Sequence, residues 1–144
     1  SYKILNVGCG NSLISEKLYG EDYTIYNLDF SRTIIEKQSE KYTENPNMKW
    51  ICQDITESSN IKKNTFDIII DKATMDSIAC NSFKLVSTAF NQIIRMLKKN
   101  GIYVLVSINQ NILDYCNIDD IEIIDIKNMI NNSKTIYIYI LQKK

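Results

Sequence analysis

Lys3-Ile-Leu-Asn-Val-Gly-Cys-Gly-Asn-Ser12 decides the fold, because an apolar strand runs directly into two glycines one residue apart. Gly8 and Gly10 can adopt backbone angles closed to other residues, and they leave room for a ligand against the main chain. Further along, Asn27-Leu-Asp29 ends the next predicted strand, where a carboxylate can accept both hydroxyls of a ribose. The pattern predicts a binding site for a nucleoside cofactor.

The same stretch disfavours a dinucleotide cofactor. The dinucleotide fingerprint needs a third glycine where the helix crosses the strand, and Leu13 occupies that position. NAD is therefore the weaker prediction. A plain strand-to-helix turn remains the alternative explanation of the two glycines.

Length and composition indicate one compact domain without the net positive charge that would attract nucleic acid or anionic lipids. The chain has 144 residues, and 17 Lys plus Arg balance 17 Asp plus Glu, so nucleic acid and anionic membranes are not expected partners. Without histidine or a Cys-x-x-Cys pair, a metal site is not expected, and the scattered cysteines predict reduced thiols in a cytoplasmic protein. No apolar run reaches the eighteen or so residues that span a bilayer, so we expect a soluble protein.

Strand and helix patterns alternate along the first three quarters of the chain. Strands are expected at Lys3–Val7, Thr24–Leu28, Met48–Gln53, Phe66–Ile70 and Ile102–Ile108. Helices are expected at Ser12–Tyr19, from a cap at Ser31 to Tyr42, and at Phe83–Lys99 with a left-handed stop at Asn100-Gly101. The run Ile68-Ile69-Ile70 is apolar on both faces, which is typical of a central strand in a covered parallel sheet.

The last quarter follows a different pattern. Glu122–Ile126 and Thr135–Leu141 read as strands, and the polar connection Asn128–Lys134 is too short for a crossover helix. An antiparallel hairpin is therefore expected. The whole pattern predicts an α/β fold: a Rossmann-like, doubly wound, seven-stranded sheet that is mostly parallel and ends in an antiparallel C-terminal hairpin.

These motifs resemble those of the class I, seven-stranded S-adenosylmethionine-dependent methyltransferases over nearly the whole chain. Asn6-Val-Gly-Cys-Gly-Asn-Ser12 resembles that family's glycine motif, with Asn6 where an acidic residue is more usual, and acidic residues close successive strands. Asp71-Lys-Ala-Thr-Met-Asp-Ser77 is similar to the branch that contains lysine methyltransferases of translation elongation factor one-alpha, which usually have Gly at position 73. The resemblance implies S-adenosylmethionine as cofactor and S-adenosylhomocysteine as product.

The cofactor site can be assigned residue by residue. Phe30 and Ile55 follow strand ends and would sandwich the adenine, while Asp54 would accept from its amino group, as the resemblance implies. Ordinary core packing is the alternative for Phe30, and a turn aspartate is the alternative for Asp54. The full predicted set is Gly8, Cys9, Gly10, Asn11, Asp29, Phe30, Asp54, Ile55 and Asp71.

Catalysis is expected to rest on alignment of donor and acceptor rather than on a metal. We assign positioning roles to Asp71 and Asp76, because a close carboxylate would raise the pKa of an acceptor lysine when transfer needs it lowered. The alternatives are a helix cap for Asp71 and a surface loop for Asp76. Thr74 and Met75 would line the lip of the active site.

The expected acceptor is a protein lysine, or another protein amine, and the partner a protein such as a translation factor. A small-molecule acceptor and a non-catalytic module that binds S-adenosylmethionine or a partner are the alternatives. Residues 1–144 are expected to form a single methyltransferase domain that lacks the cofactor-covering residues that usually precede the first strand. A monomer is slightly favoured over a dimer.

Overall fold

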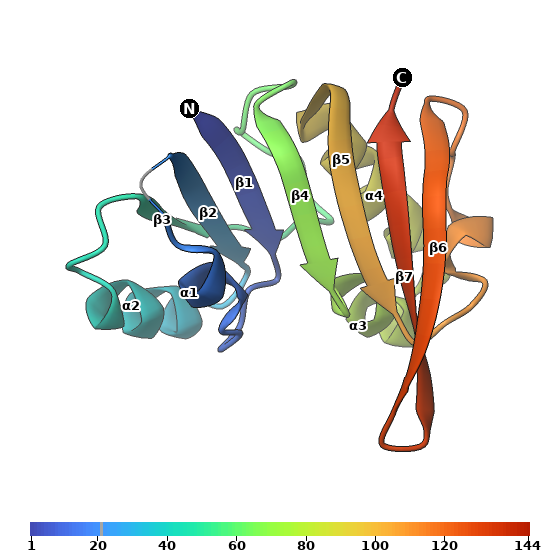
Figure 1. The fold of residues 1–144 in the computed structure, drawn as a ribbon, viewed down its shortest axis with the longest axis horizontal. Helices are drawn as coiled ribbons and strands as arrows, with labels where there is room; N and C mark the ends of the chain where they lie inside the picture. Colours follow the sequence, from blue (N-terminus) through green and yellow to red (C-terminus); the bar gives the residue numbers. More distant parts are fainter. Residues whose placement is uncertain (21) are drawn as a thin grey trace.

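A seven-stranded sheet with the order β3-β2-β1-β4-β5-β7-β6 organises the computed structural model, which describes residues 1–20 and 22–144 (Figure 1). The first five strands are parallel, and β7 pairs antiparallel with both β5 and β6. This is the predicted architecture. The strands are β1 Tyr2–Val7, β2 Tyr23–Asp29, β3 Met48–Cys52, β4 Phe66–Lys72, β5 Leu97–Ser107, β6 Ile121–Asn131 and β7 Lys134–Lys143.

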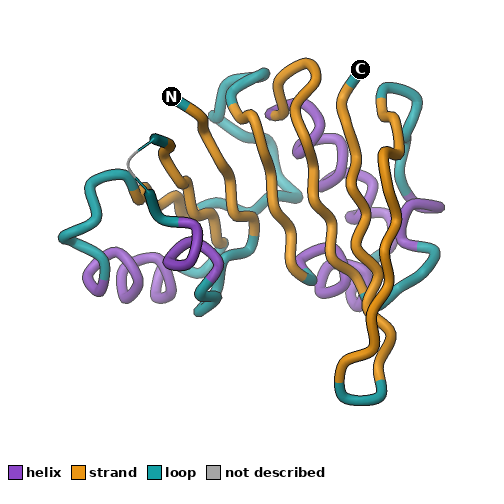
Figure 2. The backbone as a smooth tube through the Cα atoms, in the orientation of Figure 1, coloured by secondary structure: helices purple, strands orange, loops and turns teal. Residues whose placement is uncertain are grey.

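Helices lie on both faces of the sheet (Figures 1 and 2). Helices α1 Ile14–Leu18 and α2 Arg32–Lys41 connect β1, β2 and β3 on one face. Helices α3 Thr74–Asn81 and α4 Phe83–Met96 connect β4 to β5 on the other face, and a short 3-10 helix, η1 Ile112–Tyr115, follows β5. None of the described helices is long and apolar enough to cross a bilayer.

The main core lies between α4 and the central strands. The apolar side of α4 is completely buried, as the helical spacing predicted, and it packs on the inward side chains of β4 and β5. Each such side chain stabilises the fold by about 1.5–3 kcal/mol through burial. The α4 residues are Val86, Ala89, Phe90, Ile93 and Met96, all 0% exposed.

Strand pairing fixes the edge at which ligands can bind. β1 pairs with β2 on one side and β4 on the other, so the chain changes direction across the sheet at β1. In open parallel sheets the crevice at such a switch point, beyond the carboxyl ends of the strands, is where ligands bind. The glycine motif begins there, because Gly8 directly follows β1.

Two boundaries differ from the prediction at the junction of α4 and β5. The helix ends at Met96 instead of Lys99, because Leu97 is fully buried and pairs with Phe66 of β4. Asn100 adopts the left-handed conformation, with φ 62°, inside the irregular start of β5 rather than at a helix end. The pairing of Leu97 with Phe66 therefore ends the helix three residues before the end that the helical periodicity predicted.

The C-terminal hairpin is longer than predicted. β6 and β7 stay paired from Ile121 with Lys143 to Asn131 with Lys134, and Asn132 and Ser133, with φ 48° and 65°, form the turn. The predicted connection Asn128–Lys134 was wrong, because most of its residues are in strands. Polar side chains are tolerated there because this part of the hairpin is exposed on both faces.

Candidate active site

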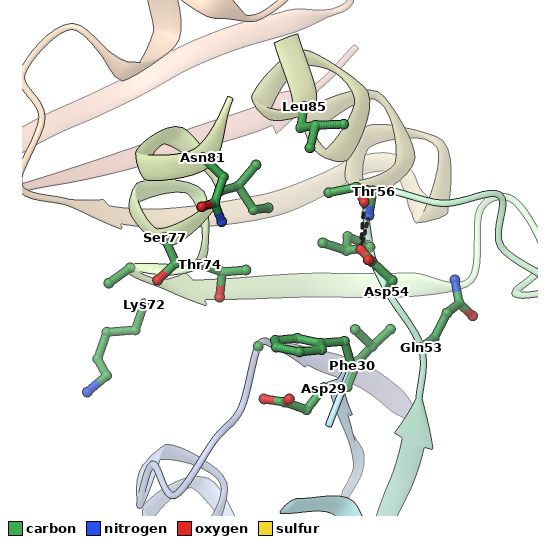
Figure 3. A pocket seen from close by; sticks show the side chains of 15 residues that line it. Asp29, Phe30, Gln53, Asp54, Thr56, Lys72, Thr74, Ser77, Asn81 and Leu85 are labelled. Carbon is green, nitrogen blue, oxygen red and sulfur yellow. Dashed lines mark hydrogen bonds between the residues drawn. The ribbon is translucent and has the colours of Figure 1, made fainter. Parts of the chain in front are cut away.

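A cavity of about 440 Å³ opens at the carboxyl edge of the sheet. The ends of β1, β2 and β3 form one wall, and α3 with the start of α4 forms the other (Figure 3). Its volume lies in the range of small-molecule sites. Five of the predicted cofactor residues line it, namely Gly8, Asp29, Phe30, Asp54 and Ile55.

The two glycines of the loop differ in the space around them. Both Gly8 and Gly10 have positive φ, 60° and 47°. A Cβ on Gly8 would collide with the Thr74 side chain, whose hydroxyl donates to the Val7 carbonyl oxygen at 2.9 Å. A Cβ on Gly10 would meet nothing within 4 Å. The backbone at Gly10 is therefore open to a ligand, whereas Gly8 packs against α3.

Asp29 ends β2 with its carboxylate held in place on the cavity wall. Its Oδ2 accepts from the Gly10 N–H at 3.0 Å, and its Oδ1 accepts from the Ser31 N–H at 2.9 Å. The side chain is only 8% exposed, yet it lines the cavity. Each carboxylate oxygen has a further lone pair, so Asp29 can accept from ligand hydroxyls without giving up these bonds.

The same wall also carries apolar surface from Phe30 and Ile55 and two polar side chains, Asp54 and Gln53. Phe30 is 76% exposed over the opening, so the core-packing alternative does not apply to it, and Ile55 is buried beneath. Asp54 Oδ1 accepts from both the N–H and the hydroxyl of Thr56, at 2.8 and 2.7 Å. Gln53 lines the cavity too, and its buried Nε2 has no hydrogen-bond partner within the part of the chain that the structure describes.

An apolar slot beside a carboxylate that is held in place suits a nucleoside, so the residues present fit the predicted cofactor.

Sequence reasoning named only Thr74 on the opposite wall. Ser77, Ile78 and Asn81 line the cavity beside it from one side of α3, and Leu85 continues that side on α4. Met75, which was expected with Thr74 at the lip of the active site, is fully buried instead. The spacing of three and four residues is the helical signal that could have revealed this wall.

Asp71 lies beneath this wall and does not line the cavity. It is 0% exposed, and its carboxylate accepts from the Thr74 N–H at 2.8 Å and from the Tyr103 hydroxyl at 3.0 Å. Burial raises the pKa of Asp71 to about 7, although these hydrogen bonds oppose the shift. The geometry matches the helix-cap alternative, because Asp71 holds the first residue of α3.

Asp76 also lies outside the cavity lining. It points from α3 to the end of β5, where it accepts from the Ser107 hydroxyl and from the Ile108 N–H, the latter at 2.9 Å. Asp76 is therefore on a helix and not on the surface loop that was the alternative. Both aspartates hold α3 in place, and neither lines the cavity, where direct positioning of an acceptor amine would need them.

The other predicted residues surround the cavity without lining it. The Gly10 N–H donates to Asp29, which lines the cavity, but Gly10 itself does not line it. Burial, followed by the charge of Asp29, raises the pKa of Cys9 to about 12, so its thiol stays protonated at neutral pH. Asn11 Oδ1 accepts from Gln38 Nε2 at 2.9 Å and so joins the loop to α2. Within residues 1–20 and 22–144, no three Cys, Asp or Glu side chains gather to hold a metal ion.

Comparison with known families gives a match over almost the whole chain. A family described as "Methyltransferase domain" matches residues 1–143. Among characterised proteins, the chain is 31% identical over 114 residues to the "eEF1A lysine and N-terminal methyltransferase" of Mus musculus and to that of Homo sapiens. These matches cover 75% of this chain but 16% of either relative, so the chain spans about a sixth of their length.

Solved structures share the fold at low sequence identity. The N-methyltransferase NodS from Bradyrhizobium japonicum WM9, in complex with S-adenosyl-L-homocysteine, aligns with a TM-score of 0.83 and 14% identity over 99% of this chain and 78% of its own. A TehB-like SAM-dependent methyltransferase from Corynebacterium glutamicum aligns with a TM-score of 0.78 and 18% identity, over 99% and 80% of the two chains.

Proposed function

The chain belongs to the methyltransferase-domain family whose methyl donor is S-adenosylmethionine, and on that premise we propose that it methylates the side-chain amine of a protein lysine. The observation that carries the choice of acceptor is the 31% identity to relatives named for lysine and N-terminal methylation of eEF1A. The same names support a translation factor as the partner and the cytoplasm as the compartment.

Residues on the first wall would hold the cofactor. Asp29 accepts the ribose hydroxyls, Phe30 and Ile55 flank the adenine, and Asp54 accepts from its amino group. A hydrogen bond to a charged group of this kind is worth about 1.5–3 kcal/mol. Gly10 lets the ligand approach the main chain. When bound, S-adenosylmethionine supplies an electrophilic methyl group on a positively charged sulfur.

Residues on the second wall would orient the acceptor amine. A lysine with a reference pKa of about 10.4 must lose its proton before transfer, and both desolvation and a neighbouring positive charge lower its pKa. Thr74, Ser77 and Asn81 present neutral oxygens to the cavity, so they can align the amine without favouring its charged form. Asp71 and Asp76 act on α3, which carries these residues.

The test is transfer of labelled methyl groups from S-adenosylmethionine to proteins in a cell extract and to purified translation factors, with the modified residue located by mass spectrometry. We expect label on lysine. Asn81→Ala should reduce transfer at least tenfold and leave cofactor affinity within twofold, because Asn81 faces the acceptor side. Label only on small molecules, or no label despite cofactor binding, would instead favour the small-molecule enzyme or the non-catalytic module.

A further inference from the structure

Strand β6 leaves the outer edge of the sheet open. It is 11 residues long, and in the described part of the chain it pairs with β7 alone. In an edge strand, every second residue directs its N–H and C=O away from the sheet. β6 therefore offers a row of backbone donors and acceptors on which another extended chain can pair.

The same strand exposes a series of apolar side chains. A long, regular edge with exposed apolar residues is the kind that proteins usually block, because it favours added strands. The irregularity of β6 is confined to Ile123–Asp125, and its pairing with β7 is regular from Asp125 to the turn. The exposed residues, 41–77% accessible, are Ile123, Ile124, Ile126, Met129 and Ile130.

The hairpin also projects past the edge at which the cavity lies (Figure 1). One row of paired residues crosses the sheet: Val7, Asp71, Leu105, Tyr139 and Ile126. Residues 127–138 lie beyond that row, on the side of the glycine loop, and β5 stops at Ser107 opposite Tyr137. The hairpin tip, defined as residues 126–136, therefore extends past the same edge of the sheet at which the cavity opens.

Its distance from the cavity can be estimated from strand geometry. Three strand spacings of about 4.8 Å separate β4 from β6, and five residues at about 3.3 Å separate Ile126 from Asn131. The end of the hairpin is thus about 22 Å from the end of β4. An extended polypeptide covers that distance with about seven residues.

The hairpin tip carries positive charge only. Lys127 and Lys134 lie within residues 126–136, which contain no Asp or Glu. Asp125 contacts Lys127 at 3.7 Å, but both side chains are about half exposed or more, so this pair contributes little and can exchange. A basic, apolar strand edge is complementary to an extended segment that alternates acidic and apolar residues.

Resting on the proposed function, we propose that the outer edge of β6 at the hairpin tip docks an extended acidic-apolar segment of the protein substrate, about seven residues from the methylated lysine. The segment adds as a strand to β6. Its apolar side chains pack on Ile126 and Ile130, which share one face of β6. Its acidic side chains lie on the other face, with Lys127 and with Lys134, which pairs with Asn131.

Binding can be measured with a fluorescent peptide of alternating Glu and Val and with its Lys-Val counterpart. On the wild-type protein we expect the Glu-Val peptide to bind at least tenfold more tightly. The double variant Lys127→Glu/Lys134→Glu should reverse the preference. Lys62→Glu/Lys63→Glu, with the same charge change in the connection between β3 and β4, should leave it unchanged.

Measurements of methyl transfer to peptides test docking at the hairpin tip separately from the proposed lysine methylation. A peptide with one lysine seven residues from a Glu-Val segment should show a KM at least fivefold below that of the same peptide with the segment replaced by Gly and Ser. The Lys127→Glu/Lys134→Glu variant should abolish that difference while it retains wild-type affinity for S-adenosylhomocysteine.

Equal binding of both peptides, or a Glu-Val preference that survives charge reversal, would overturn docking at the hairpin tip. So would a dimer that becomes monomeric on charge reversal, because a second copy would then occupy the edge. Charge-dependent peptide binding without transfer to any lysine would support docking and refute lysine methylation.

Discussion

Gly8 and Gly10 adopt the same left-handed conformation for different reasons. Gly8 is confined by Thr74 of α3, whereas Gly10 faces open space and donates its N–H to Asp29. Gly8 therefore packs against α3 where it lines the cavity, whereas Gly10 lies beside the cavity and holds the Asp29 carboxylate. A sequence motif alone cannot separate the two roles.

Substitution of the two glycines should distinguish these roles. Gly8→Ala should destabilise the protein by about 2–3 kcal/mol, because it adds the collision with Thr74 to the cost of positive φ. Gly10→Ala should cost about 1 kcal/mol in stability but weaken S-adenosylmethionine binding at least tenfold. Urea unfolding and calorimetric titration measure the two effects. Introducing Thr74→Ala should recover about 1 kcal/mol for Gly8→Ala, and no recovery would argue against the collision.

Asp29 offers the sharpest test of the cofactor site. Asp29→Asn preserves shape but removes the charge that would strengthen hydrogen bonds from ribose hydroxyls. Cofactor affinity should fall tenfold to more than a hundredfold, measured by calorimetry with S-adenosylmethionine and S-adenosylhomocysteine. Asp119→Asn, an exposed carboxylate outside the cavity lining, is the matched control. Tight NAD binding by the wild-type protein would contradict the assignment.

At the scale of elements, α3 forms the wall of the cavity opposite the ends of β1, β2 and β3, and hydrogen bonds attach it to the sheet. Asp71 holds its first turn, Asp76 connects it to the end of β5, and Thr74 contacts the glycine loop. The helix begins after Ala73, which has φ 68°, a conformation that costs a residue with a Cβ about 1–2 kcal/mol. The position of α3 on the cavity wall thus depends on a strained residue.

Ala73→Gly should relieve that strain. We expect a gain of about 0.5–1 kcal/mol in unfolding free energy, after allowance for the greater freedom of glycine in the unfolded chain. Ala79→Gly, inside the same helix, should instead lose about 0.5–1 kcal/mol. Denaturant unfolding of both variants checks the two signs, and a loss of stability in Ala73→Gly would show that the left-handed residue is not strained.

At the scale of the whole molecule, a buried carboxyl makes stability depend on pH. The pKa of Asp71 is about 7 in the folded protein and near 3.9 in an unfolded chain, so the folded state binds the proton more tightly. The resulting stability is fully present below about pH 4 and is lost as pH rises through 7. Tyr103, whose pKa burial and Asp71 hold well above its usual value, stays neutral throughout.

Asp71→Asn should remove this dependence while it keeps an acceptor for Thr74 and a partner for Tyr103. Relative to the wild type, the variant should gain a few kcal/mol of stability between pH 4.5 and pH 8. Urea unfolding across that range is the measurement. Parallel stability curves for the two proteins would mean that Asp71 does not titrate with a raised pKa.

Much of the fold and part of the site followed from local patterns. The alternation of strands and helices predicted the sheet, and the residues at strand ends predicted Asp29, Phe30, Asp54 and Ile55 on one wall of the cavity. Residues 74–81 were not recognised as a helix, so Ser77, Ile78 and Asn81 were missed. Their pattern is short, because eight residues make only about two helical turns, and a mixture of polar and apolar residues over that length fits a loop equally well.

The sequence by itself determined the class of fold and the residues on one wall of the cavity, because hydrophobic periodicity and glycine spacing depend on neighbours close in the chain. Only the tertiary structure decided that Asp71 is buried against Tyr103, that Gly8 packs on Thr74, and that the hairpin projects past the carboxyl edge of the sheet (Figure 1). Those relations depend on strand register and on contacts between residues far apart in the sequence. No local pattern encodes them, since they arise when the strands and helices pack together.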